Sequence, residues 1–160
     1  MANYALTNGS TSNAGTEQPT ATTYVGAILG VTGANSAPRR VKIYDILIGT
    51  NGTPADNFME WTVDRVTLAS TATAATPLPL DTGDAAAVST CTINSSTFGT
   101  ITAKSQVFYI GVNQRASYRW VAAPGSELVS PATSSAGFQL RTRSGGYTGT
   151  ATGNILFQEQ

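Results

Sequence analysis

The sequence predicts an all-β fold, either a jelly roll or a β-sandwich of eight to nine short antiparallel strands. No window carries apolar residues at the three- and four-residue spacing of an amphipathic helix. Thr, Val, Ile, Tyr and Phe instead fall in short runs that Gly, Pro, Asn and Ser separate. A chain of 160 residues also fits a single domain, since a domain of this size buries about 70% of the surface that its unfolded chain exposes.

Each predicted strand is a run rich in β-branched or aromatic residues that ends at turn-forming residues. In chain order the runs are residues 23–31, 39–49, 58–68, 87–93, 98–103, 106–112, 116–122, 137–142 and 150–158. The domain is expected to span residues 23–160. Residues 1–22 hold few apolar side chains to offset their ordering entropy. We therefore expect them to form a flexible N-terminal arm, either loose or ordered by a neighbouring subunit.

The first two predicted strands differ in what their residues require. The first contains the apolar stretch "YVGAILGV", which is far shorter than the roughly 20 residues of a membrane span. In the second, "VKIYDILIG" places Asp45 between Ile43 and Leu47 on one strand face. Because an unpaired buried charge is very costly, we expect Asp45 to have a cationic partner, an Arg on a neighbouring strand or in a neighbouring subunit.

The third predicted strand carries two carboxylates, Glu60 and Asp64, which are the strongest candidates for acid–base catalysis. Four strand steps separate their backbones by about 13 Å, whereas the carboxyl groups of glycosidases lie roughly 5–9.5 Å apart. The carboxylates alternate with the apolar residues of "FMEWTVDRV". This alternation predicts a solvent face opposite a core face rather than a catalytic pair.

The segment before the fourth strand contains a second pair of carboxylates. Residues 70–87 are low in complexity and hold two prolines, so we expect a surface excursion. The "DTGD" at 81–84 is predicted to be a turn, because a calcium loop needs more acidic ligands and an aspartic protease needs a second Asp loop. In the fourth strand, Cys91 has no basic neighbour in sequence to lower its pKa. It is predicted to be a buried, inert thiol.

The C-terminal strands hold most of the arginines. In "ASYRWVA", Tyr118 and Trp120 share one face, which we expect to be core, while Arg119 projects from the other face. The planar guanidinium pairs well with carboxylates and carbonyls and is weakly hydrated, which suits interfaces. The predicted subunit or capsid interface residues are Asp45, Arg115, Arg119, Arg141 and Arg143.

Two Gly- or Pro-containing segments connect the last strands. Residues 123–137 are long enough to carry the chain from one sheet to the other. The Gly-rich stretch at 143–153 lacks the Lys-Ser/Thr ending and the following helix of a phosphate-binding loop. It is predicted to be the hairpin turn between the last two strands.

The composition excludes several classes of protein. The chain has no histidine, which removes Ser-His-Asp and Cys-His catalysis and the usual imidazole zinc sites. Nine basic and nine acidic residues cancel, so no net field attracts nucleic acid or an anionic membrane. The first basic side chain is Arg39, so no signal peptide is expected. We predict no catalytic, cofactor-binding or metal-binding residue, and therefore a protein that is not an enzyme and needs no cofactor.

A family pattern becomes visible in residues 112–160. This run contains a Tyr-Arg-Trp strand, an Ala-Pro-Gly turn, an "LVSPAT" crossing and a Gly-Phe-Gln-Leu-Arg strand, followed by a Thr/Ala-rich strand. It resembles the end of small virion proteins of tailed bacteriophages, and the opening Met-Ala-Asn-Tyr-Ala-Leu is similar to them as well. The resemblance is to head decoration, or cement, proteins, which are small β-sandwich or jelly-roll domains that trimerise on the capsid.

The resemblance implies a capsid decoration protein that binds the outer face of the assembled head as a homotrimer and stabilises capsomer junctions. Its expected partners are copies of itself and the phage major capsid protein, and its expected location is the virion surface after assembly in the host cytoplasm. The alternative is a carbohydrate-binding β-sandwich module of a tail fibre or lectin. The Asn, Asp, Thr and Tyr side chains of residues 49–57 and 144–149 suit sugar hydroxyls, but no pair of exposed aromatic residues is evident.

Overall fold

The described part of the chain is made of β-strands joined by turns and loops. The computed structural model describes residues 1–9, 18–19, 27–34, 36–67, 73–95, 97, 99–101, 105–144 and 149–160. Within these residues the chain forms thirteen strands and no helix. The strands are β1 (Asn3–Thr7), β2 (Gln18–Pro19), β3 (Ala27–Thr32), β4 (Val41–Asn51), β5 (Phe58–Val66), β6 (Thr73–Ala75), β7 (Leu78–Pro79), β8 (Thr90–Ile93), β9 (Gln106–Asn113), β10 (Tyr118–Val121), β11 (Leu128–Val129), β12 (Gly137–Ser144) and β13 (Thr150–Glu159).

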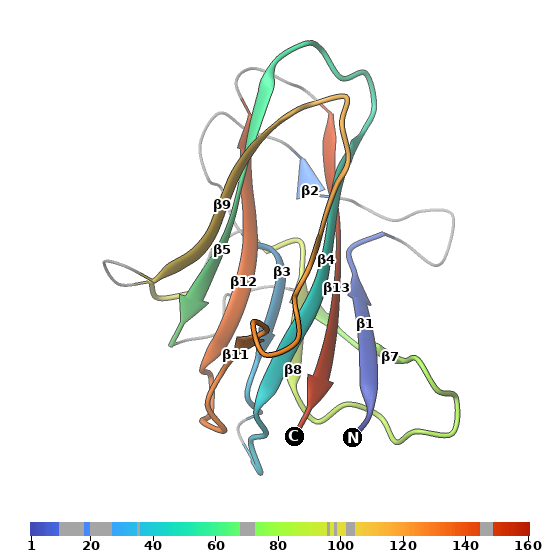
Figure 1. Cartoon of the computed structure of the whole chain (residues 1–160), viewed down its shortest axis with the longest axis vertical. Coiled ribbons are helices and arrows are strands. Elements are labelled where there is room, and N and C mark those ends of the chain that lie inside the picture. The colour runs from blue at the N-terminus through green and yellow to red at the C-terminus, as the bar shows by residue number, and fades with distance from the viewer. Residues whose placement is uncertain are drawn as a thin grey trace.

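The strands form two antiparallel sheets. The seven-stranded sheet has the order β10-β4-β13-β1-β7, with β11 also paired to β4 and β2 to β13. The six-stranded sheet has the order β6-β8-β3-β12-β5-β9. Figure 1 shows β1 beside β13, with the two chain ends close together at one end of the molecule.

The pairing of the main strands is nested. Strand β1 pairs with β13, β3 with β12, β4 with β10 and β5 with β9. The first of these eight strands thus meets the last, the second meets the next to last, and so on inwards. This nesting, divided over two sheets, is the arrangement of a jelly roll. The predicted all-β fold is confirmed, and nine of the thirteen strands have four or more residues.

The core lies between the two sheets and explains the alternating sequences. Along β13 every second residue from Ala151 to Glu159 is buried, which is the period of two that a strand with one core face requires. The largest fully buried side chains include Trp61, Phe138 and Phe157. Tyr118 and Trp120 pack against this core as predicted. The ring centroid of Phe108 on β9 lies 6.1 Å from that of Tyr118 and 6.3 Å from that of Trp120.

Eight of the nine predicted runs contain a strand, and the ninth contains none among its described residues. In the predicted run 98–103 the described residues 99–101 form no strand, so that prediction is wrong for them. The backbone N–H of Gly99 donates to Oε1 of Gln139 at 2.8 Å, and the N–H of Thr67 donates to the carbonyl of Thr100 at 3.2 Å. These contacts tie the segment to β12 and to the end of β5 as a loop. Residues 98 and 102–103 lie outside the described residues.

The N-terminal residues differ from the predicted arm. Residues 3–7, within the segment 1–22 expected to be flexible, form β1 and pair with both β13 and β7. Tyr4 and Leu6 are each 2% exposed, and the ring of Tyr4 stacks on Phe157 with centroids 5.4 Å apart. Two apolar side chains at alternate positions are enough to place this polar segment in the core. Residues 10–17 and 20–22 lie outside the described residues.

The expected surface excursion at 70–87 is also tied to both sheets. Its residues 73–75 form β6 at one edge of the six-stranded sheet, and residues 78–79 form β7 at the edge of the seven-stranded sheet. Just after it, the buried carboxylate of Glu159 accepts hydrogen bonds from the N–H groups of Val88 at 3.1 Å and Ser89 at 2.7 Å. A carboxylate that accepts two backbone N–H bonds forms strong, charge-assisted contacts, so this end of the connection is anchored to β13.

Two glycines are required by the backbone. Gly52, in the turn between β4 and β5, has a φ of 102°, a conformation that glycine adopts readily and other residues rarely do. At the start of β12, a Cβ added to Gly137 would lie only 2.0 Å from the carbonyl oxygen of Val31 and 2.6 Å from Cα of Thr32. Only glycine allows β12 to approach β3 so closely at this point.

Cys91 is buried, as predicted, and its burial has a consequence at alkaline pH. The side chain is 3% exposed, and burial together with the charge of Glu159 raises the pKa of the thiol to about 12 from 9.0. Between these two pKa values the unfolded chain loses a proton that the folded chain keeps, so stability falls as pH rises. We expect the free energy of unfolding to drop by roughly 1 kcal/mol per pH unit from this group.

The test is chemical denaturation of the wild type and of Cys91→Ala between pH 8 and pH 11. Tyrosines contribute to the loss of stability in both proteins, so the difference between the two slopes isolates the thiol. The Ala variant is expected to lose stability less steeply above pH 9. Equal slopes would show that the thiol ionises as easily in the folded protein as in the unfolded chain.

Candidate functional site

The predicted interface residues lie on opposite faces of the sandwich. Arg119 lies on the outer face of the seven-stranded sheet, because its neighbours Tyr118 and Trp120 turn toward the core. Arg141 and Arg143 lie on the outer face of the six-stranded sheet, because Leu140 between β3 and β5 turns inward. The sequence therefore identified charged residues of two separate surfaces, and the four arginines do not gather into one.

Asp45 has the cationic partner that the sequence required. The Nε atom of Arg119 on the neighbouring strand β10 donates to both carboxylate oxygens of Asp45, at 3.0 Å and 3.1 Å. The Asp45 side chain is 6% exposed and that of Arg119 is 62% exposed. The hydrogen bonds and the negative charge of Asp45 raise the pKa of Arg119. The pair places a fixed guanidinium at the surface of the seven-stranded sheet.

The six-stranded sheet holds a buried ion pair that corrects a prediction. Asp64, expected on a solvent face, is 1% exposed, and Arg141 is 6% exposed. Nε of Arg141 donates to Oδ2 of Asp64 at 2.7 Å, and the hydroxyl of Thr62 donates to the same oxygen at 3.0 Å. The alternating pattern correctly predicted that Asp64 points away from the core. However, the outer face of the six-stranded sheet is itself buried at Asp64 of β5 and Arg141 of β12.

Glu60, the other carboxylate of β5, is paired as well. It lies directly across from Arg143 and forms an ion pair with it. A hydrogen bond with Glu60 is also the main reason why the pKa of Tyr109 is raised. Both carboxylates of β5 thus belong to cross-strand ion pairs.

Sequence reasoning missed a row of aligned side chains across the seven-stranded sheet. Strand registers place Leu78 beside Ala5, Ala5 beside Leu156, Leu156 beside Asp45 and Asp45 beside Val121. All five lie on the outer face, and we call them the cross-strand row. Leu78 is 61% exposed and Val121 is 58% exposed. Only the register of five strands aligns these residues, so no local sequence pattern reveals them.

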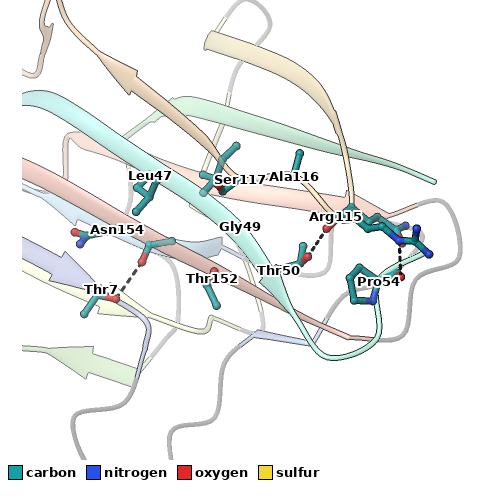
Figure 2. A pocket seen from close by; sticks show the side chains of 13 residues that line it. Thr7, Leu47, Gly49, Thr50, Pro54, Arg115, Ala116, Ser117, Thr152 and Asn154 are labelled. Carbon is teal, nitrogen blue, oxygen red and sulfur yellow. Dashed lines mark hydrogen bonds between the residues drawn. The ribbon is translucent and has the colours of Figure 1, made fainter. Parts of the chain in front are cut away.

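A pocket lies at one end of the same face (Figure 2). Its volume is about 450 Å³. The floor is formed by the outward residues of β1, β4 and β13, and the walls by the β9–β10 loop and the β4–β5 loop. The lining residues include Thr7, Leu47, Gly49, Thr50, Pro54, Gln114, Arg115, Ala116, Ser117, Thr152 and Asn154.

Arg115, the remaining predicted interface residue, belongs to this pocket. Its Nε donates to the carbonyl oxygen of Pro54 at 3.3 Å, and its Nη1 lies 3.2 Å from Oδ2 of Asp56. The two side chains of this pair are 59% and 72% exposed, so the pair contributes little to stability. It fixes the β9–β10 loop against the β4–β5 loop and so closes one wall of the pocket.

No group of three or more Cys, Asp or Glu side chains in the described part of the chain could hold a metal ion. Nor does any helix with the length and hydropathy of a membrane span occur in it. Comparison with protein-family models, with curated protein sequences and with solved structures finds no match for this chain.

Proposed function

We propose that this chain is a capsid decoration protein of a tailed bacteriophage, which binds the outer face of the assembled head as a homotrimer. The major capsid protein is its partner on the head. The outer face of the seven-stranded sheet rests on the coat, and the bound trimer bridges capsomer junctions. The observation that carries the proposal is the cross-strand row, which places exposed apolar side chains on a face built from five paired strands.

The chemistry of this face favours a protein partner. Leu78, Val121 and neighbouring Leu47, which is 44% exposed, are apolar, and exposed apolar patches on a soluble domain mark interaction sites. Arg119 lies beside Leu47, its register partner on β4, and Asp45 holds its guanidinium, whereas Leu78 lies at the opposite edge of the sheet. Interfaces combine these features, because their centres exclude most charges but are enriched in Arg.

The resemblance of residues 112–160 to decoration proteins supports the same assignment. This run supplies β10 and β13, which carry Arg119, Val121 and Leu156 of the proposed surface. The balanced charge of the chain also suits a partner that is neither nucleic acid nor an anionic membrane.

The mechanism follows from selective binding. A junction between capsomers exists only in the assembled head, so a protein that binds it stabilises the assembled state over the dissociated one by mass action. Contacts that span the junction add to those that the coat subunits already make. A head with bound trimers should therefore resist heat and internal pressure better than a bare head.

The test is co-sedimentation of the purified chain with heads assembled from the major capsid protein of the same phage. Val121→Glu places a charge in the proposed interface and is expected to abolish binding. The matched control is Val107→Glu, since Val107 is 36% exposed on the outer face of the six-stranded sheet. Binding by Val121→Glu, or its loss only in Val107→Glu, would reject the proposed face, and no binding by the wild type would reject the function.

A further inference from the structure

The pocket at the end of the seven-stranded sheet has the size of a small-ligand site. Its volume of about 450 Å³ falls in the range of roughly 300–1,000 Å³ that ligand pockets occupy. Its depth depends on Gly49 of β4, where an added Cβ would lie 3.3 Å from Oγ1 of Thr152 and 3.9 Å from Cβ of Ser117. A larger side chain at Gly49 would fill the space between β13 and the β9–β10 loop.

The lining of the pocket is rich in neutral hydrogen-bonding groups. Hydroxyls come from Ser117 and Thr152, and a carboxamide comes from Asn154. The buried carboxamide of Gln114 and the hydroxyl of Thr7 also line the pocket, but they already hydrogen-bond to backbone groups of the protein. Figure 2 shows Thr7, Asn154 and Thr152 along the floor and Ser117 across from them. Hydroxyls and carboxamides both donate and accept hydrogen bonds, so they match a ligand whose groups also do both.

Asn154 adds a specific signal. Its Oδ1 is buried and has no hydrogen-bond partner, and a buried acceptor without a donor is costly. The last torsion of an Asn side chain rotates over a broad range. Rotation of the carboxamide would bring Oδ1 toward the pocket. This rotation breaks no hydrogen bond at Oδ1, because the oxygen accepts none. A donor on a ligand would then satisfy it.

The charges around the pocket disfavour an anionic ligand. Arg115 is the only charged residue among the described lining residues. Its guanidinium is already paired with Asp56 at 3.2 Å and with the carbonyl of Pro54 at 3.3 Å. A phosphate or carboxylate would have to compete with Asp56, whereas a neutral ligand leaves this pair intact.

We propose that the pocket binds a neutral sugar of one or two rings. The sugar hydroxyls would pair with the hydroxyls of Ser117 and Thr152 and with the carboxamide of Asn154. The apolar face of a ring would rest on Leu47, Pro54 and Ala116. No aromatic ring occurs among the described lining residues, so the binding is weak, with a Kd in the millimolar range. This inference goes beyond the proposed function and does not depend on it, because sugar binding is measured on the isolated protein without heads.

The test is a titration of isotope-labelled protein followed by NMR. Methyl glycosides of glucose, galactose, mannose and N-acetylglucosamine are added separately up to tens of millimolar. We expect at least one of them to shift the amide resonances of Gln114, Ala116, Thr152 and Asn154. If none of the four sugars shifts these resonances, or if the shifts occur elsewhere on the protein, the proposal is rejected.

The matched variants are two strand glycines. Gly49→Val fills the pocket and is expected to weaken binding by about tenfold or more, since the added side chain occupies the space of the ligand. Gly111→Val is the control, because an added Cβ at Gly111 on β9 meets no atom within 4 Å. Ser117→Leu, at an exposed loop position, blocks the same space if Gly49→Val fails to fold. Unchanged affinity in both blocking variants would place the sugar outside the pocket.

Discussion

Replacing Arg141 by methionine is expected to lower the free energy of unfolding by about 3–5 kcal/mol, because it leaves the carboxylate of Asp64 buried without its cation. Asp64 is 1% exposed, and the pair is joined at 2.7 Å. For a domain of this size such a loss lowers Tm by roughly 10 °C. Thermal and urea denaturation of the purified variant measure both quantities.

Two controls separate the charge effect from the loss of side-chain volume. The double variant Asp64→Leu with Arg141→Met removes both charges and is expected to recover much of the lost stability, since an apolar pair of similar volume often replaces a buried ion pair without cost. Arg115→Met breaks an exposed pair and is expected to cost at most about 1 kcal/mol. If Arg141→Met is as mild as Arg115→Met, the ion pair is not buried as described.

Replacing Tyr4 by alanine is expected to cost about 3–5 kcal/mol, the range for removing a large aromatic ring from a core. The ring is 2% exposed, stacks on Phe157, and its hydroxyl donates to the carbonyl of Ala85 at 3.0 Å. The large effect would come from a residue in the segment that composition alone predicts to be a flexible arm. Urea denaturation monitored by tryptophan fluorescence measures it.

The neighbouring residues of β1 provide the controls for Tyr4→Ala. Tyr4→Phe keeps the ring and loses only the hydrogen bond to Ala85, so it is expected to cost about 1 kcal/mol. Asn3→Ala changes the outer face of the same strand and is expected to change stability by less than about 0.5 kcal/mol. A neutral Tyr4→Ala would mean that β1 does not belong to the folded domain.

The sequence predicts the fold class well because the signal is local. A strand with one core face needs only alternation and turn residues at its ends, and both are visible in runs such as "FMEWTVDRV" and "NILFQE". The same rule fails where local apolar content is low. Residues 3–7 carry only two large apolar side chains, and their position is set by pairing with β13, about 150 residues away along the chain.

The environment of charged residues was predictable only in part. The expectation that Asp45 lies between Ile43 and Leu47 on one strand face is wrong, because the β4–β13 register shifts next to Asp45, so that Ile43 is buried in the core and Leu47 is 44% exposed. The cation expected for Asp45 is nevertheless present, as Arg119 on the next strand. For Asp64 the alternation gave the correct side of the sheet and the wrong exposure. Burial on an outer face depends on which other segments cover that face, and a period of two contains no information about this covering.

The cross-strand row could not be predicted from the sequence, because its residues are aligned only by the register in which five strands pair. Leu78, Leu156 and Val121 come from three distant segments, and each alone is an ordinary exposed or partly buried apolar residue. The pocket is similar, since β1, β4, β13 and two loops all contribute to it. The sequence predicted that Asn, Asp and Thr of the 49–57 loop suit sugars. Of these residue types only Thr50 lines the pocket, and its hydroxyl donates to the carbonyl of Gln114. Residues 145–148 of the other loop lie outside the described residues.

The central claim is that the outer face of the seven-stranded sheet holds the protein on an assembled head. Electron cryomicroscopy of heads to which the purified chain has been added tests it most directly. The proposal predicts added density as trimers at capsomer junctions, with β10, β4 and β13 facing the coat. Density in which this sheet faces solvent would contradict the assigned surface, and heads without added density would contradict the function itself.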